Sequence, residues 1–494
     1  MVKPYIIGIA GESGVGKSTI AEIISLFYGP ENTTVISTDD LHKWERTNSI
    51  WETITHLNPE ANNLELGDIH ILELAQGKSI FRSVYNHKTG NFNPPLKMEP
   101  RQIVVVEGLH AFYTDVSKDV IDMKIYVNTN DELKCHWKIV RDTEERGYKY
   151  NAVLDAINKR KKDADTIRSI QLAVADVVFN IEPTQKIKCL GDKTEKVELS
   201  LSCHFQSEKS NDSLFSFIQE YISEFGIFGR ASEAIGEDIF LCQETGGNIS
   251  VKLSNNLMLI KSSGTKMKDA RKGNNYSVVN RLLLANGASL SEDDDTMNLA
   301  IQESLALSRY KRPSMEAAFH VLLDKYVVHT HPIHLTLLLC LEDSKRIISE
   351  LFNDLDFSYI EYAHPGYHLY KSIGSLEKIH QVYFLENHGV IISLEDGMTA
   401  CVDLLRSLND RAKDYIKSNC IFEDFNLSFA DREIDNYVFP DAIVFSRDHL
   451  KKEILAAHNY ITIIGKQIGK LRYISSDAVH FLQHMEAEKY RTTI

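Results

Sequence analysis

Residues Gly11 to Ser18 have types and a spacing that can bind phosphate. They read GESGVGKS and fit the pattern G-x-x-x-x-G-K-[ST], between an apolar run that predicts a strand and a run with helical periodicity. Glycines let backbone N–H groups close around phosphate oxygens, and a helix N-terminus favours negative charge. Lys17 would reach the β- and γ-phosphates of ATP, and the Ser18 hydroxyl would bind Mg²⁺. The residues that we predict for this ATP site are Gly11, Ser13, Gly14, Gly16, Lys17, Ser18 and Thr19.

Carboxylates follow two further predicted strands of the first half. Asp39 and Asp40 come after the apolar run TTVIS, and Glu107 ends the run IVVVE. A kinase that acts on an alcohol needs a carboxylate to accept the hydroxyl proton as the γ-phosphoryl group leaves. Glu107 would hold Mg²⁺ or its water. Each acid taken singly is equally consistent with helix capping or solvation, so these residues alone do not name a reaction.

In the second half, His329 and His331 alternate with a threonine in YVVHTHP. The residues YVV predict a strand, so the two imidazoles emerge on one face with Cα atoms about 7 Å apart. Imidazoles at that separation can converge on a divalent metal, although one face of a half-exposed strand explains the same pattern. VYFLENHGVIIS predicts another buried strand that ends at His388 and Gly389, and His388 is a candidate third ligand. His334 lies on the opposite face, and we predict a structural role for it.

Glu316 supplies an acid near these histidines in the segment RPSMEAAFHVLL. We predict that it lies in the first turn of a helix with Ser314 as N-cap, where it could act as a base beside the metal. The turns TGGNIS (245–250) and KSSGT (261–265) carry glycines with hydroxyl and amide groups, which can bind phosphate through backbone N–H groups. Together with His388, these turns make a metal site with its own base the preferred interpretation.

Length, charge and cysteine usage restrict the function classes. The 494 residues predict two domains, or three, and the net charge of −14 argues against broad affinity for nucleic acid or acidic membranes. The seven cysteines are scattered, odd in number and never spaced C-x-x-C, which favours a reducing compartment. No run approaches the roughly 18 apolar residues of a membrane span, and polar residues interrupt the N-terminal apolar run. We therefore expect a cytoplasmic protein.

Strands and helices alternate over residues 1–180, which predicts a parallel sheet. The expected buried strands are TTVIS, RQIVVVEG and DMKIYVN. Residues 186–192 and 196–205 predict an antiparallel hairpin after them.

We place the domain boundary at residues 225–229, which gives domains 1–225 and 229–494. In the second domain, residues 246–264 predict a hairpin, the stretch ASLSEDDDTM (288–297) predicts an exposed acidic loop, and the tail from about Arg447 predicts amphipathic helix.

Six motifs of the first half occur in the order of one family. They are GESGVGKST, STDDLH, HLNPEANNL, VYNHKTG, VVVEGLHAFY and KIVRDTEERGY, and over roughly residues 4–205 they resemble the phosphoribulokinase/uridine kinase family. The resemblance implies a P-loop kinase fold that uses ATP and Mg²⁺, with Asp39 as catalytic base and Glu107 as the acid of the second strand. The implied sugar-contacting residues are Asp40, His42, Arg46, Tyr85 and His87. The implied lid arginines are Arg141 and Arg146, and the charged, predicted helical segment around them agrees with a lid.

Five motifs of the second half resemble the class II aldolase/adducin family. They are TGGNIS, IKSSGT, RPSMEAAFH, VVHTHP and LENHG, over roughly residues 229–440, and the resemblance is to rhamnulose-1-phosphate and fuculose-1-phosphate aldolases. It implies an α/β three-layer domain, zinc ligands His329, His331 and His388, Glu316 as acid/base, and a homotetramer. The implied substrate-phosphate residues are Gly247, Asn248, Ser263, Gly264 and Ser314. Met315 departs from the family pattern, which often has a second small hydroxyl residue there.

The two resemblances together lead to the hypothesis of a bifunctional enzyme of carbohydrate metabolism. An ATP-dependent kinase would phosphorylate a sugar or nucleoside-like hydroxyl, and a zinc-dependent aldolase would cleave a ketose phosphate to dihydroxyacetone phosphate and an aldehyde. One alternative is a kinase fused to a metal-dependent decarboxylase or epimerase on the same scaffold. Another is a nucleotide-regulated, non-catalytic aldolase-like scaffold. The expected partners are small sugars or sugar phosphates, with no nucleic acid and no membrane.

Overall fold

A computed structural model describes the chain apart from residues 1–2, 87–88, 146, 184–198, 208–210, 272–274, 422, 432–433, 435, 446–450 and 486–494. The chain divides into two compact units, Met1–Ile222 and Ser223–Ile494. The division falls inside helix α6 (Asp212–Gly236), and the predicted boundary at residues 225–229 lies in the same helix. Each unit has its own sheet and core, so each is described by itself.

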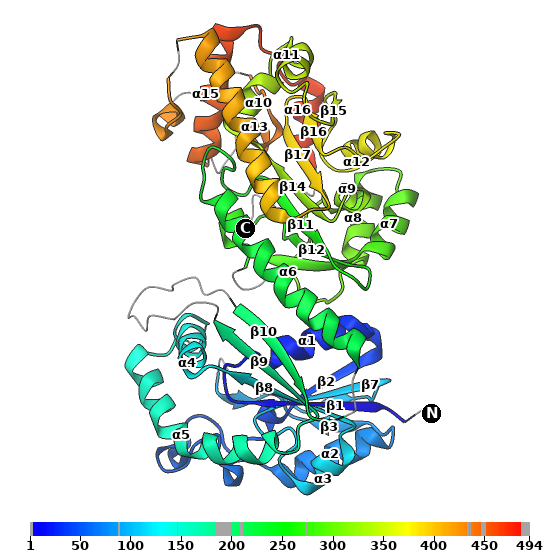
Figure 1. Ribbon diagram of the computed structural model, residues 1–494, viewed down its shortest axis with the longest axis vertical. Coiled ribbons are helices and arrows are strands. Elements are labelled where there is room, and N and C mark those ends of the chain that lie inside the picture. The colour runs from blue at the N-terminus through cyan, green and yellow to red at the C-terminus, as the bar shows by residue number, and fades with distance from the viewer. Residues whose placement is uncertain are drawn as a thin grey trace. The chain divides into compact units, whose positions relative to one another are not determined.

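The first unit is built on a six-stranded sheet in the order β10-β9-β8-β1-β7-β2 (Figure 1). Neighbouring strands run parallel except β9 and β10, which are antiparallel. The large strands are β1 (Tyr5–Gly11), β2 (Thr33–Ser37), β7 (Ile103–Gly108), β8 (Met123–Thr129), β9 (Val177–Pro183) and β10 (Leu199–Phe205). Every residue of β7 is buried, as the apolar run at residues 103–106 predicts for a strand covered on both faces. The predicted parallel sheet and its buried strands are confirmed.

Short hairpins and helices complete the first unit. Two-stranded sheets pair β3 with β6 and β4 with β5. The short strands are β3 (Ile80–Arg82), β4 (Tyr85–Asn86), β5 (Asn91–Phe92) and β6 (Leu96–Met98). The α-helices are α1 (Lys17–Tyr28), α2 (Leu64–Ala75), α3 (Asp115–Val120), α4 (Asp131–Val140) and α5 (Tyr150–Leu172).

The register of the first sheet brings three chain segments together at one edge. Glu107 of β7 pairs with Ile9 of β1 on one side and with Ser37 of β2 on the other. The glycine-rich loop begins where β1 ends, and Asp39 follows β2 by two residues. All of these residues therefore lie at the carboxyl edge of the sheet, where ligands bind in open α/β folds.

The second unit contains a seven-stranded sheet in the order β13-β12-β11-β14-β17-β16-β15. Only β15 and β16 run parallel to each other. The strands are β11 (Asn248–Lys252), β12 (Leu257–Lys261), β13 (Tyr276–Asn280), β14 (Tyr326–Thr330), β15 (Phe357–Ile360), β16 (Val382–Leu385) and β17 (Gly389–Leu394). β11 and β12 form the predicted hairpin.

Helices cover both faces of this sheet, which makes the second unit the expected three-layer α/β domain (Figure 1). One layer consists of α7 (Arg281–Leu290), α8 (Asp294–Glu303), α9 (Ala317–Leu322) and α12 (Tyr367–Gly374). The other contains α10 (Ile333–Leu339), α13 (Met398–Asn419) and α15 (Lys452–Ile468). The remaining helices are α11 (Ser344–Leu351), α14 (Pro440–Val444) and α16 (Ser476–His484). No helix among the described residues is long and apolar enough to span a membrane.

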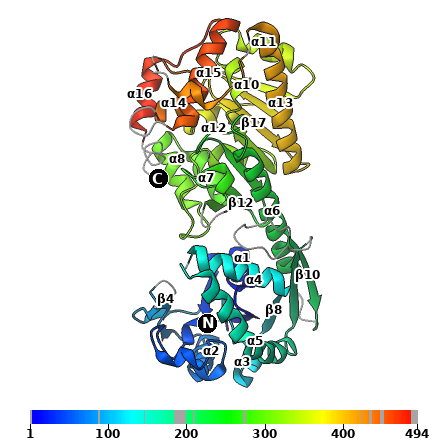
Figure 2. The same cartoon turned by 90° about the vertical axis from the view of Figure 1, so that its left-hand side faces the viewer.

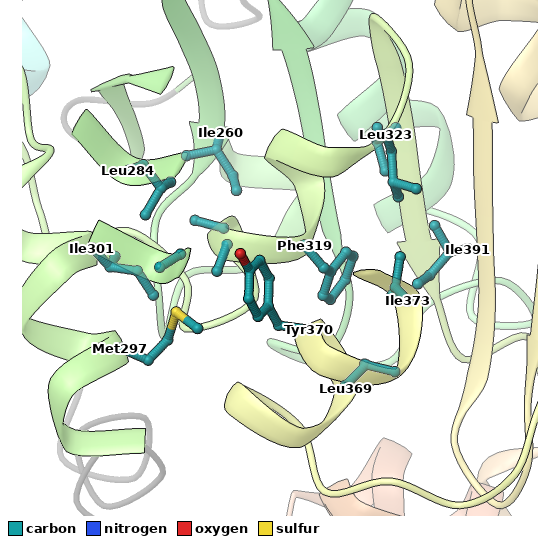
Figure 3. Packing of buried hydrophobic residues seen from close by; sticks show 14 of the residues in the cluster. Ile260, Leu284, Met297, Ile301, Phe319, Leu323, Leu369, Tyr370, Ile373 and Ile391 are labelled. Atoms are coloured by element: carbon teal, nitrogen blue, oxygen red, sulfur yellow. The ribbon is translucent and has the colours of Figure 1, made fainter. Parts of the chain in front are cut away.

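An apolar core anchors α9, the helix that follows Glu316. Phe319 of α9 packs among Leu284 of α7 and Ile373 of α12, and the sheet contributes Ile260 and Ile391 to the same cluster (Figure 3). Phe319 is fully buried. Because this core fixes the start of α9, the position of the residue just before the helix is fixed as well.

Two sequence-based expectations for local structure were wrong in the second unit. Residues 288–297 are exposed at Glu292, Asp293 and Asp295 as predicted, but only 291–293 form a loop: α7 continues to Leu290, and Asp293 caps α8 by accepting a hydrogen bond from Thr296 N at 2.8 Å. Acidic residues at a helix N-terminus pair with free N–H groups and with the helix dipole, so the same charges that suggested solvent exposure start a helix. The apolar run before His388 also does not end a strand there. It turns at Asn387, whose φ of 53° is left-handed, and returns as β17.

Two further expectations need smaller corrections. The helix after RPSM begins at Ala317 with Glu316 at the cap position, and Ser314 Oγ accepts from Glu316 N at 3.2 Å instead of capping the helix. Residues 199–205 form β10 as expected, but their partner is β9, and the predicted partner at 186–192 lies outside the described residues.

Candidate active sites

The glycine-rich loop joins β1 to α1 in the first unit. Gly14 and Gly16 have φ values of 91° and 94°, in the left-handed region that favours glycine. Lys17 is buried, and its Nζ donates to the carbonyl oxygen of Glu12 at 2.9 Å, so its ammonium folds back over the loop. Ser18 and Thr19 are exposed in the first turn of α1. The loop therefore presents backbone N–H groups, one ammonium and two hydroxyls.

The predicted base Asp39 and the acid Glu107 lie beside this loop. Asp39 Oδ1 accepts from Leu109 N at 3.1 Å, and Asp39 N donates to Ser37 Oγ at 3.2 Å. Burial raises the pKa of Glu107 and Asp39 raises it further, while Lys17 and a hydrogen bond with Ser37 oppose the rise. The two carboxylates and the ammonium therefore act on one another.

Asp40 lies next to the predicted base, but its carboxylate is occupied. Arg82 Nη2 donates to Asp40 Oδ2 at 2.9 Å, and Tyr85 N donates to Oδ1 at 2.8 Å. Arg82 also donates to the Ser37 carbonyl oxygen. Asp40 thus connects the end of β2 to the short hairpin that contains Tyr85. Because both of its carboxylate oxygens are already hydrogen-bonded, Asp40 is better suited to hold these segments in place than to accept a proton.

Aromatic rings surround His42 on the side of Asp40. The His42 ring centroid lies 4.6 Å from that of His56, 5.3 Å from Tyr85 and 5.9 Å from Trp51. His42 Nδ1 is 2.8 Å from Asn62 Oδ1, which fixes the imidazole. The Arg46 guanidinium lies over the Tyr148 ring at 5.3 Å, and it lowers the burial-raised pKa of Tyr85. Four predicted substrate residues therefore gather here: Asp40, His42, Arg46 and Tyr85. The fifth, His87, lies outside the described residues.

The predicted lid reaches the glycine-rich loop. After α4 the chain makes a π-helical turn, Arg141–Glu145, and Arg141 Nη2 donates to Ser13 Oγ at 3.3 Å. A buried ion pair between Lys138 Nζ and Asp142 Oδ2, 2.6 Å apart, holds this turn. Burial lowers the pKa of Lys138 to about 8. The second predicted lid arginine, Arg146, lies outside the described residues.

Arg160 of α5 is a cation that sequence reasoning missed. Burial lowers its pKa, and Asp142 and Asp39 both oppose that shift, so its guanidinium lies within electrostatic reach of the predicted base. The only signal in the sequence is the basic run KRKK at 159–162, which is typical of a solvated helix face.

In the second unit, His329, His331 and His388 converge. Their ring centroids are 5.0 Å apart in every pair, and one ligand atom from each lies within 4.8 Å of the others. His329 Nε2 and His331 Nε2 are 3.3 Å apart. His329 is the second-last residue of β14, beside β17, and the turn before β17 brings His388 to it.

The nitrogen chemistry of these histidines fits a divalent metal. His329 Nδ1 lies 3.0 Å from the Val390 carbonyl oxygen, so Nδ1–H donates there and Nε2 keeps its lone pair. His388 Nδ1 is buried without a hydrogen-bond partner among the described residues. Burial, His329 and His331 lower the pKa of His388, so its imidazole is neutral, the form that ligates metals.

Glu316 lies against this triad. Its Oε1 is 3.4 Å from His329 Nε2 and 3.8 Å from His388 Nε2. Its Oε2 accepts from Asn248 Nδ2 at 2.8 Å. Burial by itself would raise the pKa of Glu316, but His329 and the other partners hold it far below its usual range. Glu316 is therefore an ionised carboxylate in contact with the candidate metal ligands.

A cavity opens beside Glu316, and all five predicted phosphate residues line it. Gly247 has a φ of 68°, and a Cβ there would lie 2.6 Å from the His329 carbonyl oxygen, so only glycine fits. Asn248 Nδ2 also donates to Ser314 Oγ at 2.7 Å. The lining residues are Thr245, Gly247, Asn248, Lys261, Ser263, Gly264, Ser314, Met315, Glu316, His331, Pro365, His388, Pro440 and Asp441.

Two charged lining residues were not predicted. Lys261 is almost fully buried, and its Nζ donates to the Thr265 carbonyl oxygen at 2.8 Å. Asp441 Oδ2 lies 3.1 Å from His331 Nδ1. Lys261 stands inside the IKSSGT motif and could have been noticed there, whereas Asp441 lies in no motif.

Comparison with known proteins assigns a family model to each of the two units. Residues 6–188 match the model of the Phosphoribulokinase / Uridine kinase family, and residues 237–416 match the Class II Aldolase and Adducin N-terminal domain. A uridine kinase of Brevibacillus brevis (strain 47) is 30% identical over 166 residues, which are 31% of this chain and 73% of that protein. The chain belongs to the phosphoribulokinase/uridine kinase family through its first unit. Its second unit carries a class II aldolase/adducin domain.

Other relatives match parts of the chain. A phosphoribulokinase of Synechocystis sp. is 40% identical over 194 residues, which cover 39% of this chain and 58% of that protein. The chain spans only about half of the plant phosphoribulokinases that it matches. The solved N-terminal class II aldolase domain of a Thermoplasma acidophilum protein is 21% identical, with 42% of this chain and 97% of that chain covered and a TM-score of 0.36.

The matched ranges contain most of the site residues. The phosphoribulokinase/uridine kinase match includes the glycine-rich loop, Asp39, Glu107 and Arg160. The class II aldolase match includes the three histidines and Glu316 but ends before Asp441.

Proposed function

We propose that the protein is a bifunctional enzyme of carbohydrate metabolism. Its kinase-family domain would transfer the γ-phosphoryl group of ATP to a hydroxyl of a sugar or nucleoside-like acceptor. Its class II domain would cleave a ketose phosphate to dihydroxyacetone phosphate and an aldehyde. The observation that carries the proposal is that each unit combines an anion-binding set with a carboxylate: the half-buried Asp39 beside the glycine-rich loop, and the buried Glu316 at 3.4 Å from His329.

In the kinase centre, Asp39 would accept the proton of the acceptor hydroxyl as the phosphoryl group leaves. The hydrogen bond from Leu109 N, at 3.1 Å, orients its carboxylate. Lys17 and Arg141 would bind phosphate oxygens and balance their charge. Ser18 and Glu107 would hold Mg²⁺, which would supply positive charge against the charge that develops on the phosphates. The aromatic rings around His42 would pack against the acceptor.

In the second centre, His329, His331 and His388 would hold a divalent metal, zinc being the family's usual ion. Such a metal polarises the carbonyl of a ketose and stabilises negative charge on its oxygen. Glu316 would take and return the proton, since its ionised carboxylate is close to the metal ligands. The substrate phosphate would bind to Asn248, Ser263, Ser314 and the backbone of Gly247 and Gly264, with the Lys261 ammonium nearby.

Partners and location belong to the same proposal. Small sugars or sugar phosphates would be the substrates, and the net charge of −14 disfavours nucleic acid. We infer a cytoplasmic homotetramer, formed through the class II domain as the family resemblance implies.

A substrate screen tests the proposed function. Purified protein is incubated with ATP, Mg²⁺ and Zn²⁺ and a panel of pentoses, deoxypentoses and ketoses, and ADP and triose phosphate are measured separately. We expect ADP release with one sugar class and triose phosphate from the corresponding ketose phosphate. Product mass separates the alternatives, because decarboxylation loses CO₂ and epimerisation leaves the mass unchanged. The proposal is refuted if no sugar in the panel causes release of ADP and no ketose 1-phosphate yields triose phosphate.

Intrinsic fluorescence offers a direct binding assay for the kinase acceptor. All three tryptophans, Trp44, Trp51 and Trp137, lie in the first unit, and Trp51 packs on His42 and His56. A sugar that binds at this aromatic cluster should change the emission, whereas a ligand of the second unit should not.

A further inference from the structure

The segment 436–445, which includes α14, lies outside the range that matches the class II aldolase domain, yet it reaches the histidine triad. Asp441 is 3% exposed, and its Oδ2 lies 3.1 Å from His331 Nδ1. We call this segment the C-terminal brace. The brace could have a purely structural role, or it could orient the ligands of the proposed metal site.

Hydrogen bonds tie the C-terminal brace to the turn that carries His388. Asn387, the residue before His388, donates from Nδ2 to the Val438 carbonyl oxygen at 2.7 Å and to that of Arg472 at 2.9 Å. Cys340 Sγ donates to the same Val438 oxygen at 3.2 Å. On the other side, His458 Nε2 lies 2.9 Å from the Asn436 carbonyl oxygen. The backbone leading to Asp441 is therefore fixed relative to one metal ligand while Asp441 contacts another.

The surroundings leave room for a carboxylate and little else. A Cβ at Gly246 would lie 2.8 Å from Asp441 Oδ2 and 3.4 Å from His331 Nδ1, so a larger residue there would push the pair apart. Gly246 is itself buried. The absence of a side chain at Gly246 therefore leaves the space in which Asp441 contacts His331.

An apolar cluster holds the brace against the base. Met315, between Ser314 and Glu316, packs with Ile443 of α14, and α16 contributes Leu482 to the same cluster. α14 and α16 lie side by side (Figure 2). Met315 departs from the family pattern, and its contact with the brace gives a reason: a large apolar side chain here binds a segment beyond the range that matches the family model.

We propose that Asp441 is a positioning residue of the metal site. An Nδ1–H of His331 donates to its carboxylate, which fixes the tautomer and leaves the lone pair of Nε2 directed at His329 Nε2, 3.3 Å away. His329 has a weaker partner for the same purpose, the Val390 carbonyl oxygen at 3.0 Å. A carboxylate partner makes an imidazole a stronger ligand than a neutral carbonyl does, so the brace raises metal affinity from outside the matched domain. The inference rests on the proposed metal site.

Metal binding by full-length variants tests this role. We compare Asp441→Ala, Asp441→Asn and the unchanged protein by zinc content and by competition with a chromophoric chelator, and record the visible absorption of the Co²⁺ forms. Asp441→Ala should bind zinc about 10- to 100-fold more weakly, the usual effect of losing such a partner. The zinc affinity of Asp441→Asn should lie between those of Asp441→Ala and the unchanged protein, because the amide oxygen of Asn still accepts a hydrogen bond from His331 Nδ1–H. The Co²⁺ spectrum should shift in the same order.

Matched controls separate this effect from damage to the fold. Asp477→Asn removes an exposed carboxylate of α16 and should leave zinc affinity unchanged. Circular dichroism and ATP-dependent phosphorylation should be the same for all variants. Zinc affinity and a Co²⁺ spectrum equal to those of the unchanged protein in both Asp441 variants would overturn the inference. If the unchanged protein binds no divalent metal, the proposed metal site itself fails, and that result is distinct from equal binding by all variants.

Discussion

The two centres differ in how far they are assembled before substrate arrives. In the class II domain, His329, His388 and Glu316 are 0%, 3% and 8% exposed, and they are held by the sheet, by a turn between strands and by the start of α9, respectively. In the kinase domain, Ser18 and Thr19 are exposed and Arg141 reaches the loop from a separate helical segment. A metal centre needs fixed ligands, whereas a kinase must admit ATP, exclude water and release ADP. The centre of the class II domain is therefore buried in its core, whereas the residues of the kinase centre are divided between the sheet edge and a lid.

Removing one metal ligand should have the largest effect. We expect His388→Ala to lose bound zinc and to lower triose phosphate release by about 10⁴-fold, because several kcal/mol of charge stabilisation are lost. ATP-dependent phosphorylation should be unchanged. Metal content is measured by elemental analysis, with His480→Ala, an exposed histidine of α16, as control. Full metal content in His388→Ala would remove this residue from the site.

Asp39→Asn tests the base of the other centre. The substitution keeps the shape and the hydrogen bond from Leu109 N but cannot accept a proton, so kcat for phosphorylation should fall about 10³-fold. ATP binding, measured by calorimetry, and triose phosphate release should not change. Asp119→Asn removes an exposed carboxylate of α3 and serves as control. An unchanged kcat would show that another group takes the proton.

Arg141→Ala sharpens the contrast between a lid and a built-in site. Loss of one charge-assisted contact to phosphate should raise the KM for ATP about tenfold. The thermal unfolding temperature should change little, because Arg141 is only partly buried and Asp142, its ion-pair partner at 2.9 Å, keeps its ion pair with Lys138 at 2.6 Å. Lys149→Ala, an exposed cation nearby, should leave KM unchanged. A fall in unfolding temperature without a change in KM would instead make Arg141 a structural residue.

The smallest expected effect concerns pH. Burial lowers the pKa of His110 to about 4, and its Nε2 lies 2.9 Å from the Leu57 carbonyl oxygen. The unfolded chain takes up this proton near pH 6.5 and the folded chain only near 4, so stability is full above 6.5 and declines as pH falls toward 4. His110→Gln should reduce the slope of the unfolding free energy against pH in this window. The reduction should correspond to at most about one bound proton. Tryptophan fluorescence during urea unfolding reports it, since every tryptophan lies in the first unit. If the unfolding free energy has the same slope against pH in both proteins, the lowered pKa of His110 is contradicted.

Sequence patterns predicted those parts of the two centres that lie on regular elements. Lys17 follows from a strand, a glycine loop and a helix in succession, and His329 and His331 follow from the two-residue period of a strand. The acidic stretch at 288–297 is exposed as predicted but is mostly helical, because exposed acidic residues are equally compatible with a loop and with a helix N-terminus. Arg160 was missed because a buried cation and a solvated one are identical in sequence.

The sequence by itself determined the two folds, the phosphate loop and the identity of the candidate metal ligands, because local period and residue chemistry are enough for these. Only the tertiary structure decided the partners of those side chains. Asp441 reaches His331 across 110 positions of sequence, and Asn387 joins Val438 across 51. Contacts of this kind depend on how sheets and helices pack, and no local pattern encodes them. For that reason the sequence named the ligands of the proposed metal site, and the folded chain supplied what orients them.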